Sequence, residues 1–277
     1  METAAENPTL IKASVANILI EPLQAASVVL SNGPRIFDSS EPLIIPKMTT
    51  TSTDPGWYGQ GEQIATADVD FDEMTLMPIE RKSLKVISVV SNELLRQSNA
   101  VNLDSVLRTK LVTDVTNKLD DALLLGDGTD NSITGLLNQP GVIKAKADGA
   151  TVDGFLTGLA AMAAKESAPT VAFMAGADYF KLLGAKDSTG RPLVQPDITR
   201  AAGMVLHGVK LVVSNKVPTG KVALVNMNEV AVVRDLAAKV DPLKELYADR
   251  DSTGIRVVTR YDLGILRPEA VCLVSAA

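Results

Sequence analysis

Residues 91–135, SNELLRQSNAVNLDSVLRTKLVTDVTNKLDDALLLGDGTDNSITG, contain the longest periodic segment of the chain. The part from Leu103 to Leu125 lacks proline and glycine and predicts a single helix, about 34 Å long at ~1.5 Å per residue. Asn102 suits its N-cap and Gly126 a left-handed C-cap. Its apolar stripe consists of Leu103, Leu107, Leu111, Val115, Leu119 and Ala122, widened by Val106 and Leu123. We expect this stripe to be buried, with Leu111 and Val115 packed against a sheet.

Composition limits the possible functions. The 277 residues suffice for one elaborated domain or two. A net charge of −6 argues against tight nucleic-acid binding, because phosphate contacts need a basic face, but it allows loose contact with packaged nucleic acid. Cys272, the single cysteine, lies in an apolar run and predicts a small buried side chain. No segment reads as a signal peptide or a membrane span, so we expect a soluble protein made in the cytoplasm.

The sequence offers few catalytic groups. His207, the only histidine, has apolar neighbours and predicts a structural or surface role. The segment 126–129 lacks the lysine and the spacing of a phosphate loop, so we interpret it as a helix-terminating turn. The aspartate pairs Asp120–Asp121 and Asp249/Asp251 provide no full set of cation ligands, and we expect them on solvated faces. We therefore expect no cofactor, no metal and no catalytic residue.

Residues 1–45 are broken repeatedly by proline and show no long periodic element. A short helix is expected from about residue 22 to residue 30, with Pro22 in its first turn. The arm is either disordered or extended over a neighbouring molecule. Its apolar side chains favour the second alternative, and the contact candidates are Leu10, Ile11, Val15, Ile18 and Leu19.

Residues 47–90 predict a long hairpin, with one strand or two between Phe71 and Val90, around Pro78. Its tip has too few apolar residues to form a core, and a two-stranded ribbon is marginal alone. From Met48 to Glu80 there are seven carboxylates and no Lys, Arg or His. The ribbon is either a solvated acidic loop or an acidic arm that docks on a basic surface. The contact candidates are Trp57, Tyr58, Glu62, Asp68, Asp70, Asp72 and Glu73.

Residues 150–225 alternate between helical and strand-like segments, which is typical of an α+β or α/β module. Strands are expected at 209–213 and 222–225. Further strands at 229–234 and 254–266 flank a connection rich in Asp, Arg and Lys.

Several segments occur in a recognisable order over residues 20–277. They are Ser91–Leu95, the long helix, Leu125–Thr129, Ile133–Leu137, Phe173–Leu183, Asp187–Pro192, Val212–Pro218, Val230–Asp235, Gly254–Val258 and Arg267–Ala270. In this order they resemble the major capsid proteins of tailed phages, which have the Hong Kong 97 fold.

The resemblance implies an α+β fold with four parts. An N-terminal arm with a short helix would span 1–45, and an E-loop hairpin 46–86. A P-domain with the long spine helix would comprise 87–139 and 226–260, and an A-domain 140–225 and 261–277. The implied function is structural: hexamers and pentamers would form an icosahedral shell around a double-stranded DNA genome.

Two other functions are weighed against this one. The first is a shell protein of an encapsulin-like nanocompartment, which would enclose cargo protein instead of nucleic acid. The second is an Asp/Glu-dependent enzyme, which would be a monomer or a small oligomer with a cleft. The virion shell explains the arm, the acidic ribbon and the thin catalytic inventory together.

The resemblance also implies partners. We expect self-association, a portal, a decoration protein, loosely held DNA and no membrane. The arm begins soon after Met1, which favours a separate scaffolding protein or none.

Some family members link subunits by an isopeptide bond from an E-loop lysine to a neighbour's asparagine. The loop from Met48 to Glu80 has no lysine. We therefore expect electrostatic contacts with basic residues, for which the candidates are Arg96, Arg108, Lys110, Arg234, Lys239, Lys244, Arg250, Arg256 and Arg260.

Overall fold

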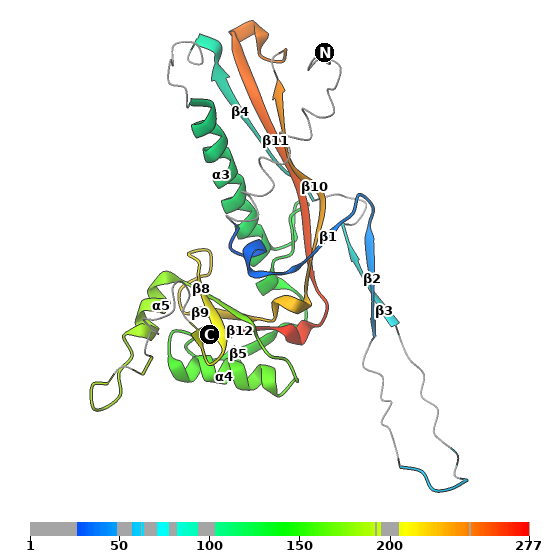
Figure 1. Cartoon of the computed structure of the whole chain (residues 1–277), viewed down its shortest axis with the longest axis vertical. Helices are drawn as coiled ribbons and strands as arrows, with labels where there is room; N and C mark the ends of the chain where they lie inside the picture. Colours follow the sequence, from blue (N-terminus) through cyan, green and yellow to red (C-terminus); the bar gives the residue numbers. More distant parts are fainter. Residues whose placement is uncertain are drawn as a thin grey trace, which may run out of the picture.

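The computed structural model describes residues 27–48, 57–61, 63, 71–77, 82–93, 103–191, 193–194, 205–243 and 245–276. Its described part contains a long four-stranded sheet with one helix beside it, a six-stranded sheet, and a two-stranded hairpin that reaches away from both (Figure 1). The mixed α+β class predicted from sequence is confirmed.

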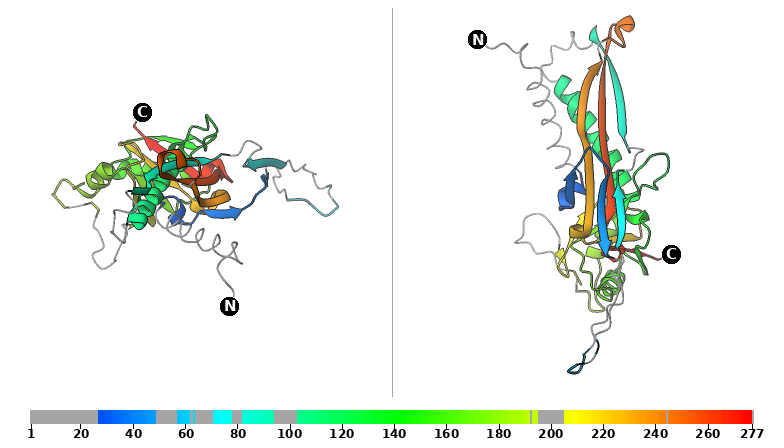
Figure 2. Two further views of the ribbon diagram at one scale, coloured as in Figure 1. Left: turned by 90° about the horizontal axis from the view of Figure 1, so that it is seen from above. Right: turned by 90° about the vertical axis from the view of Figure 1, so that its right-hand side faces the viewer.

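The four-stranded sheet has the order β1 (Arg35–Asp38), β10 (Val230–Leu243), β11 (Ser252–Ile265) and β4 (Leu84–Ser91). Strands β10 and β11 are antiparallel and 14 residues long each, and they form the axis of the molecule. Helix α3 (Leu103–Leu125) lies along one face of this sheet (Figure 2). The helix has the bounds expected from the sequence.

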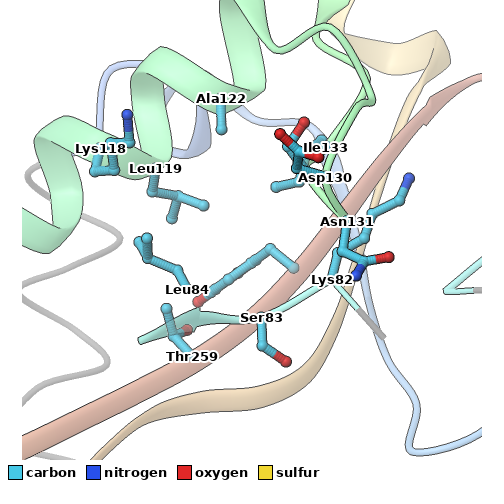
Figure 3. Close-up of a pocket in the computed structure, with 12 residues that line it drawn as sticks. Lys82, Ser83, Leu84, Lys118, Leu119, Ala122, Asp130, Asn131, Ile133 and Thr259 are labelled. Carbon is cyan, nitrogen blue, oxygen red and sulfur yellow. The ribbon is translucent and has the colours of Figure 1, made fainter. Parts of the chain in front are cut away.

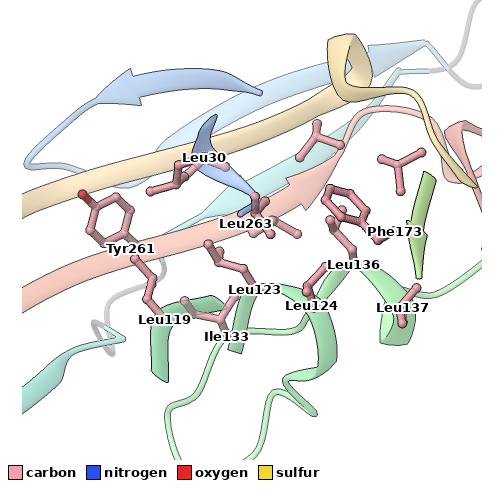
Figure 4. Close-up of a cluster of buried hydrophobic side chains, with 14 of the residues drawn as sticks. Leu30, Leu119, Leu123, Leu124, Ile133, Leu136, Leu137, Phe173, Tyr261 and Leu263 are labelled. Carbon is pink, nitrogen blue, oxygen red and sulfur yellow. The ribbon is translucent and has the colours of Figure 1, made fainter. Parts of the chain in front are cut away.

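The apolar stripe of α3 packs onto the core of the sheet from Leu111 onward, and the side chains of Leu103, Val106 and Leu107 lie outside the described residues. Leu111 and Val115 are buried, as expected, and belong to one cluster with Val257 of β11. Burial is greatest toward the end of the helix, where Leu123 is fully enclosed near Leu263 (Figure 4). Side chains repeating every three or four residues share one helix face, so this stripe turns one face of α3 toward the sheet.

The end of α3 differs from the prediction. Gly126 is not left-handed; Gly128 is, with φ +76°. Gly126 is needed for space, because a Cβ there would lie 2.0 Å from the carbonyl oxygen of Ile133. The amide of Asn138 caps the helix instead, with Nδ2 donating to the carbonyl oxygens of Leu125 (2.8 Å) and Gly126 (3.0 Å). Glycine is required at position 126 because the backbone at Ile133 approaches it closely, and the local sequence does not reveal this approach.

The six-stranded sheet has the order β5 (Ile143–Lys146), β12 (Val271–Ser275), β9 (Lys221–Val225), β6 (Val171–Met174), β8 (Val209–Val213) and β7 (Val205–Leu206). Helices α4 (Val152–Ala163) and α5 (Gly176–Leu183) accompany it. Short 3-10 helices are η1 (Leu30–Asn32), η2 (Leu136–Asn138), η3 (Met227–Glu229), η4 (Ala248–Arg250) and η5 (Pro268–Ala270).

The two sheets share a core through β6. Ala172 and Met174 point toward the cluster that includes Phe155 of α4. Val171 and Phe173 point the other way, into the cluster that holds the α3 stripe. Because successive strand residues face opposite sides, one four-residue strand joins the two cores.

The structure adds to one expectation before residue 46 and corrects another after residue 234. Strands β1 and β2 (Leu43–Met48) lie in and beside the arm, where no long periodic element was expected and no particular strand was predicted. They are four and six residues long, and β1 forms by parallel pairing with the edge of β10, which no local pattern reveals. Strand β10 runs on to Leu243, so Lys239 lies in a strand and not in a connection. The expected helix at 22–30 is not seen at 27–29, and residues 22–26 lie outside the described residues.

We predict that Leu123→Ala lowers the free energy of unfolding of the subunit by about 2–5 kcal/mol, because it leaves a cavity in the shared core. Asn117→Ala, at an exposed position of the same helix, is the control and should change it by less than about 0.5 kcal/mol. Urea titration of both variants measures the difference. Equal stability of the two would contradict the packing of α3.

Candidate assembly interface

Strands β2 and β3 (Phe71–Leu76) form an antiparallel hairpin from the pair Leu43–Leu76 to the pair Met48–Phe71. Within the described part, this two-stranded sheet is separate from the other two. It extends away from the body, with residues 57–61 at its far end (Figure 1). The expected ribbon without a core of its own is confirmed for these residues.

The base of the hairpin is fixed on the four-stranded sheet. Leu76 and Met77 are buried in a small cluster with Ala231 and Val233 of β10. On the neighbouring strand, a Cβ at Gly264 would lie 2.6 Å from Sδ of Met74. The ends of the Met74 and Leu76 side chains therefore pack directly over Gly264 of β11.

A buried carboxylate reinforces this seating. Asp262 is 1% exposed and accepts hydrogen bonds from the backbone N–H of Met77 (2.8 Å) and from Nζ of Lys82 (2.8 Å). These two residues lie on either side of the segment that leads from β3 to β4. A buried carboxylate is tolerable only with such donors, because its desolvation is costly. Sequence reasoning missed Asp262, because its partners Met77 and Lys82 lie 185 and 180 positions away and no local pattern reveals them.

The far end of the hairpin exposes aromatic and acidic groups. Trp57 is fully exposed, at 103% of its reference area, and Tyr58 is partly exposed. Asp72 and Glu73 are exposed on β3, and Asp72 is in register with Lys47. Glu62, Asp68 and Asp70 lie outside the described residues, so their placement stays a prediction.

Several candidate basic residues already bind carboxylates of their own chain. Arg234 donates through Nε and Nη2 to both oxygens of Asp38, at 2.5 and 2.8 Å. This hydrogen-bonded pair holds the pKa of Asp38 below its usual value and raises the pKa of Arg234. Arg256 lies 2.8 Å from Asp241. A neighbour's acidic loop would have to compete with these contacts.

Other candidates differ in their availability. Lys110 lies 2.8 Å from Asp114, and Arg260 lies 2.9 Å from Asp235. Arg250 is 79% exposed, and its Nε lies 3.6 Å from Asp249, too far for a hydrogen bond. Arg96 and Lys244 lie outside the described residues, and the side chains of Arg108 and Lys239 are also outside them. Among the described candidates, Arg250 is therefore the most accessible to another molecule.

The root of the N-terminal arm is anchored on α3. Asp120 is 3% exposed and accepts from Oγ of Ser27 (2.6 Å) and the backbone N–H of Val28 (2.8 Å). The neighbouring Asp121 lies 3.0 Å from Lys216. The expectation of a solvated face at 120–121 is thus wrong for Asp120, because the arm root covers it. The arm candidates Leu10, Ile11, Val15, Ile18 and Leu19 lie outside the described residues.

His207 and Cys272, the two residues considered as possible reactive groups, lie in a turn and in the core. His207 is exposed in the β7–β8 turn, with φ 50° beside Gly208. Cys272 is fully buried in β12, and burial raises the pKa of its thiol to about 11. Within the described ranges, no three His, Cys, Asp or Glu side chains are grouped to hold a metal ion. No helix in the part that the structure describes is long and apolar enough to span a membrane.

Comparison with known proteins agrees with this architecture. A major capsid protein of Klebsiella oxytoca phage phiKO2 is 22% identical over 298 residues, covering 98% of this chain and 68% of that protein. The capsid of the native GTA particle has a TM-score of 0.73 at 15% identity, with 90% of each chain covered. A Mycobacterium phage Adephagia structure has a TM-score of 0.71 at 18% identity, covering 99% of this chain and 98% of that one.

The model of the phage capsid family matches residues 9–276, nearly the whole chain. The long sheet with its helix, the second sheet and the projecting hairpin are the parts that the sequence resemblance implied. The chain therefore belongs to the phage capsid family and has the Hong Kong 97 fold.

Proposed function

We propose that this chain is the major capsid protein of a tailed phage, and that its copies assemble as hexamers and pentamers into an icosahedral shell around double-stranded DNA. The observation that carries the proposal is the hairpin β2–β3, which projects from the subunit and ends in a fully exposed Trp57. An isolated two-stranded ribbon is marginally stable in water. A neighbouring copy is the partner that a self-assembling family provides.

The proposed division of labour follows the architecture. The four-stranded sheet with α3 supports a P-domain at 87–139 and 226–260, and the six-stranded sheet an A-domain at 140–225 and 261–277. The hairpin supports an E-loop at 46–86, preceded by an arm at 1–45. Two facts refine these limits: β11 continues to Ile265, and residues 27–38 pack on their own subunit.

Further partners belong to the same proposal. They are a portal, a scaffolding protein and a decoration protein. Packaged DNA would be held loosely, because a net charge of −6 gives no basic lining. The subunit would be made in the host cytoplasm and function in the virion.

Electron microscopy of the purified protein tests assembly. We expect closed particles or hexameric and pentameric rings. A homogeneous monomer under all assembly conditions would contradict the proposal. If particles isolated from producing cells contain a cargo protein and no nucleic acid, the chain forms the shell of a nanocompartment instead.

We predict that the shell is held without isopeptide bonds, since residues 48–80 provide no lysine nucleophile. Boiled particles should run as one monomer band in denaturing gels. A ladder of covalent oligomers would show that this prediction is wrong.

We predict that the acidic hairpin contributes to assembly electrostatically. Glu62→Lys combined with Asp70→Lys should reduce particle yield and make the remaining particles more sensitive to salt. Each exposed pair contributes only about 0–1 kcal/mol, but the contact repeats at every subunit. Particle yield against NaCl concentration measures this, with Glu166→Lys, which reverses a single charge on an exposed turn after α4, as the control outside the hairpin. If particle yield depends on NaCl concentration in the same way for the double variant and the control, the acidic hairpin makes no electrostatic contribution to assembly.

We predict that deleting residues 1–20 leaves a folded subunit that assembles poorly. The anchor between Ser27 and Asp120 remains in the truncated chain, so the thermal unfolding midpoint of the subunit should stay within a few degrees of the full-length value. Size-exclusion chromatography should then show fewer particles. Normal particle yield would mean that the arm has no role in assembly.

A further inference from the structure

A pocket of about 170 Å³ opens between α3, β4, β11 and the loop 130–133 (Figure 3). Its floor is apolar and consists of Leu84, Leu119, Ala122 and Ile133. Lys82 and Lys118 stand at its rim. A single water needs only ~10–15 Å³ of such volume, so the pocket has room for a side chain.

The wall of this pocket is preformed by the loop after α3. Asp130 and Asn131 are both left-handed, with φ 50° and 58°. Asp127 holds the turn by accepting from the N–H of Thr129 (3.1 Å) and from Oγ of Ser132 (3.2 Å). These hydrogen bonds also keep the pKa of Asp127 below its usual value. A wall fixed in this way needs no ordering when a partner binds, which favours affinity.

The hairpin tip offers a side chain of matching chemistry. Trp57 is the only tryptophan of the chain and is fully exposed. Moving a large aromatic side chain from water into an apolar site is favourable, and Trp and Tyr are enriched among the residues that contribute most to binding at protein interfaces. The hairpin base is fixed at Asp262, and its far end points away from α3 (Figure 1). The pocket of the same subunit is therefore not where this indole can bind.

One cation at the pocket supports the match. The Trp57 tip belongs to a segment with seven carboxylates and no basic residue, and the exposed Lys118 lines the pocket. Lys82 is already bound to Asp262, and Asp130 adds one carboxylate to the pocket wall. An ammonium group near an indole face also gains a cation–π attraction of ~0.5–2 kcal/mol.

We propose that in the assembled shell this pocket receives the indole of Trp57 from a neighbouring copy of the chain. The proposal rests on the proposed capsid function and names the anchor of its intersubunit contact. The indole covers the apolar floor and lies beside the ammonium group of Lys118.

Fluorescence of the single tryptophan tests this directly. In assembled wild-type particles, the emission maximum should be shifted to shorter wavelength relative to dissociated subunits, and acrylamide quenching should fall several-fold. Ala122→Leu fills the pocket and keeps a strong helix former at that position. Its particles should keep the emission and quenching of an exposed indole, or fail to form although the subunit remains folded by circular dichroism.

A second variant covers the case in which Ala122→Leu does not fold. Lys118 is exposed on α3, so Lys118→Glu is expected to fold, and it should raise quenching in particles or lower their yield. Lys165→Glu, on the exposed turn after α4 and outside the pocket, is the charge-matched control and should behave like wild type.

The outcomes separate this proposal from the capsid function. Particles in which Trp57 is freely quenched would overturn the pocket and leave the capsid function intact. Protected Trp57 that is unaffected by both pocket variants would also overturn it, since the indole would then be bound elsewhere. Absence of any particles from the wild-type protein would count against the capsid function itself.

Discussion

The packing of α3 on β11 supports every other part of this subunit. The buried stripe that ends at Leu123 fixes the helix on the long sheet, and β6 carries the same core into the six-stranded sheet through Val171 and Phe173. Because interiors are close-packed, the two sheets cannot move independently without opening this core. The result is a stiff body, and the segments that leave it have defined starting points.

Two buried carboxylates define those starting points. Asp262 holds the base of the hairpin through Met77 and Lys82, and Asp120 holds the root of the arm through Ser27 and Val28. Their burial makes them effective, since hydrogen bonds to a charged group are strong where water is excluded. A shell built from many copies needs arms that leave each subunit in the same direction. The fixed roots at Asp262 and Asp120 meet that requirement.

Local sequence was informative where one helix or strand determines its own pattern. The spacing of Leu111, Val115 and Leu119 gave the long helix, and the alternation in β4 separated its faces, with Ile87 exposed and Val86 packed on the core. It failed where contacts between distant segments decide. Strand β1 exists because β10 offers an edge, and Gly126 is required by the approach of Ile133. The pairing of Arg234 with Asp38 spans 196 positions, so composition could suggest the cation but not its partner.

The central claim is that the parts of the hairpin and the arm beyond their anchored roots are stabilised by neighbouring copies and not by their own subunit. Hydrogen–deuterium exchange of free subunits and assembled particles compares the two states directly. We expect backbone amides of the outer part of the hairpin, residues 48–71, to become strongly protected only in particles, whereas those of the second half of α3 are protected in both states. Equal exchange of the hairpin in the two states would contradict this account.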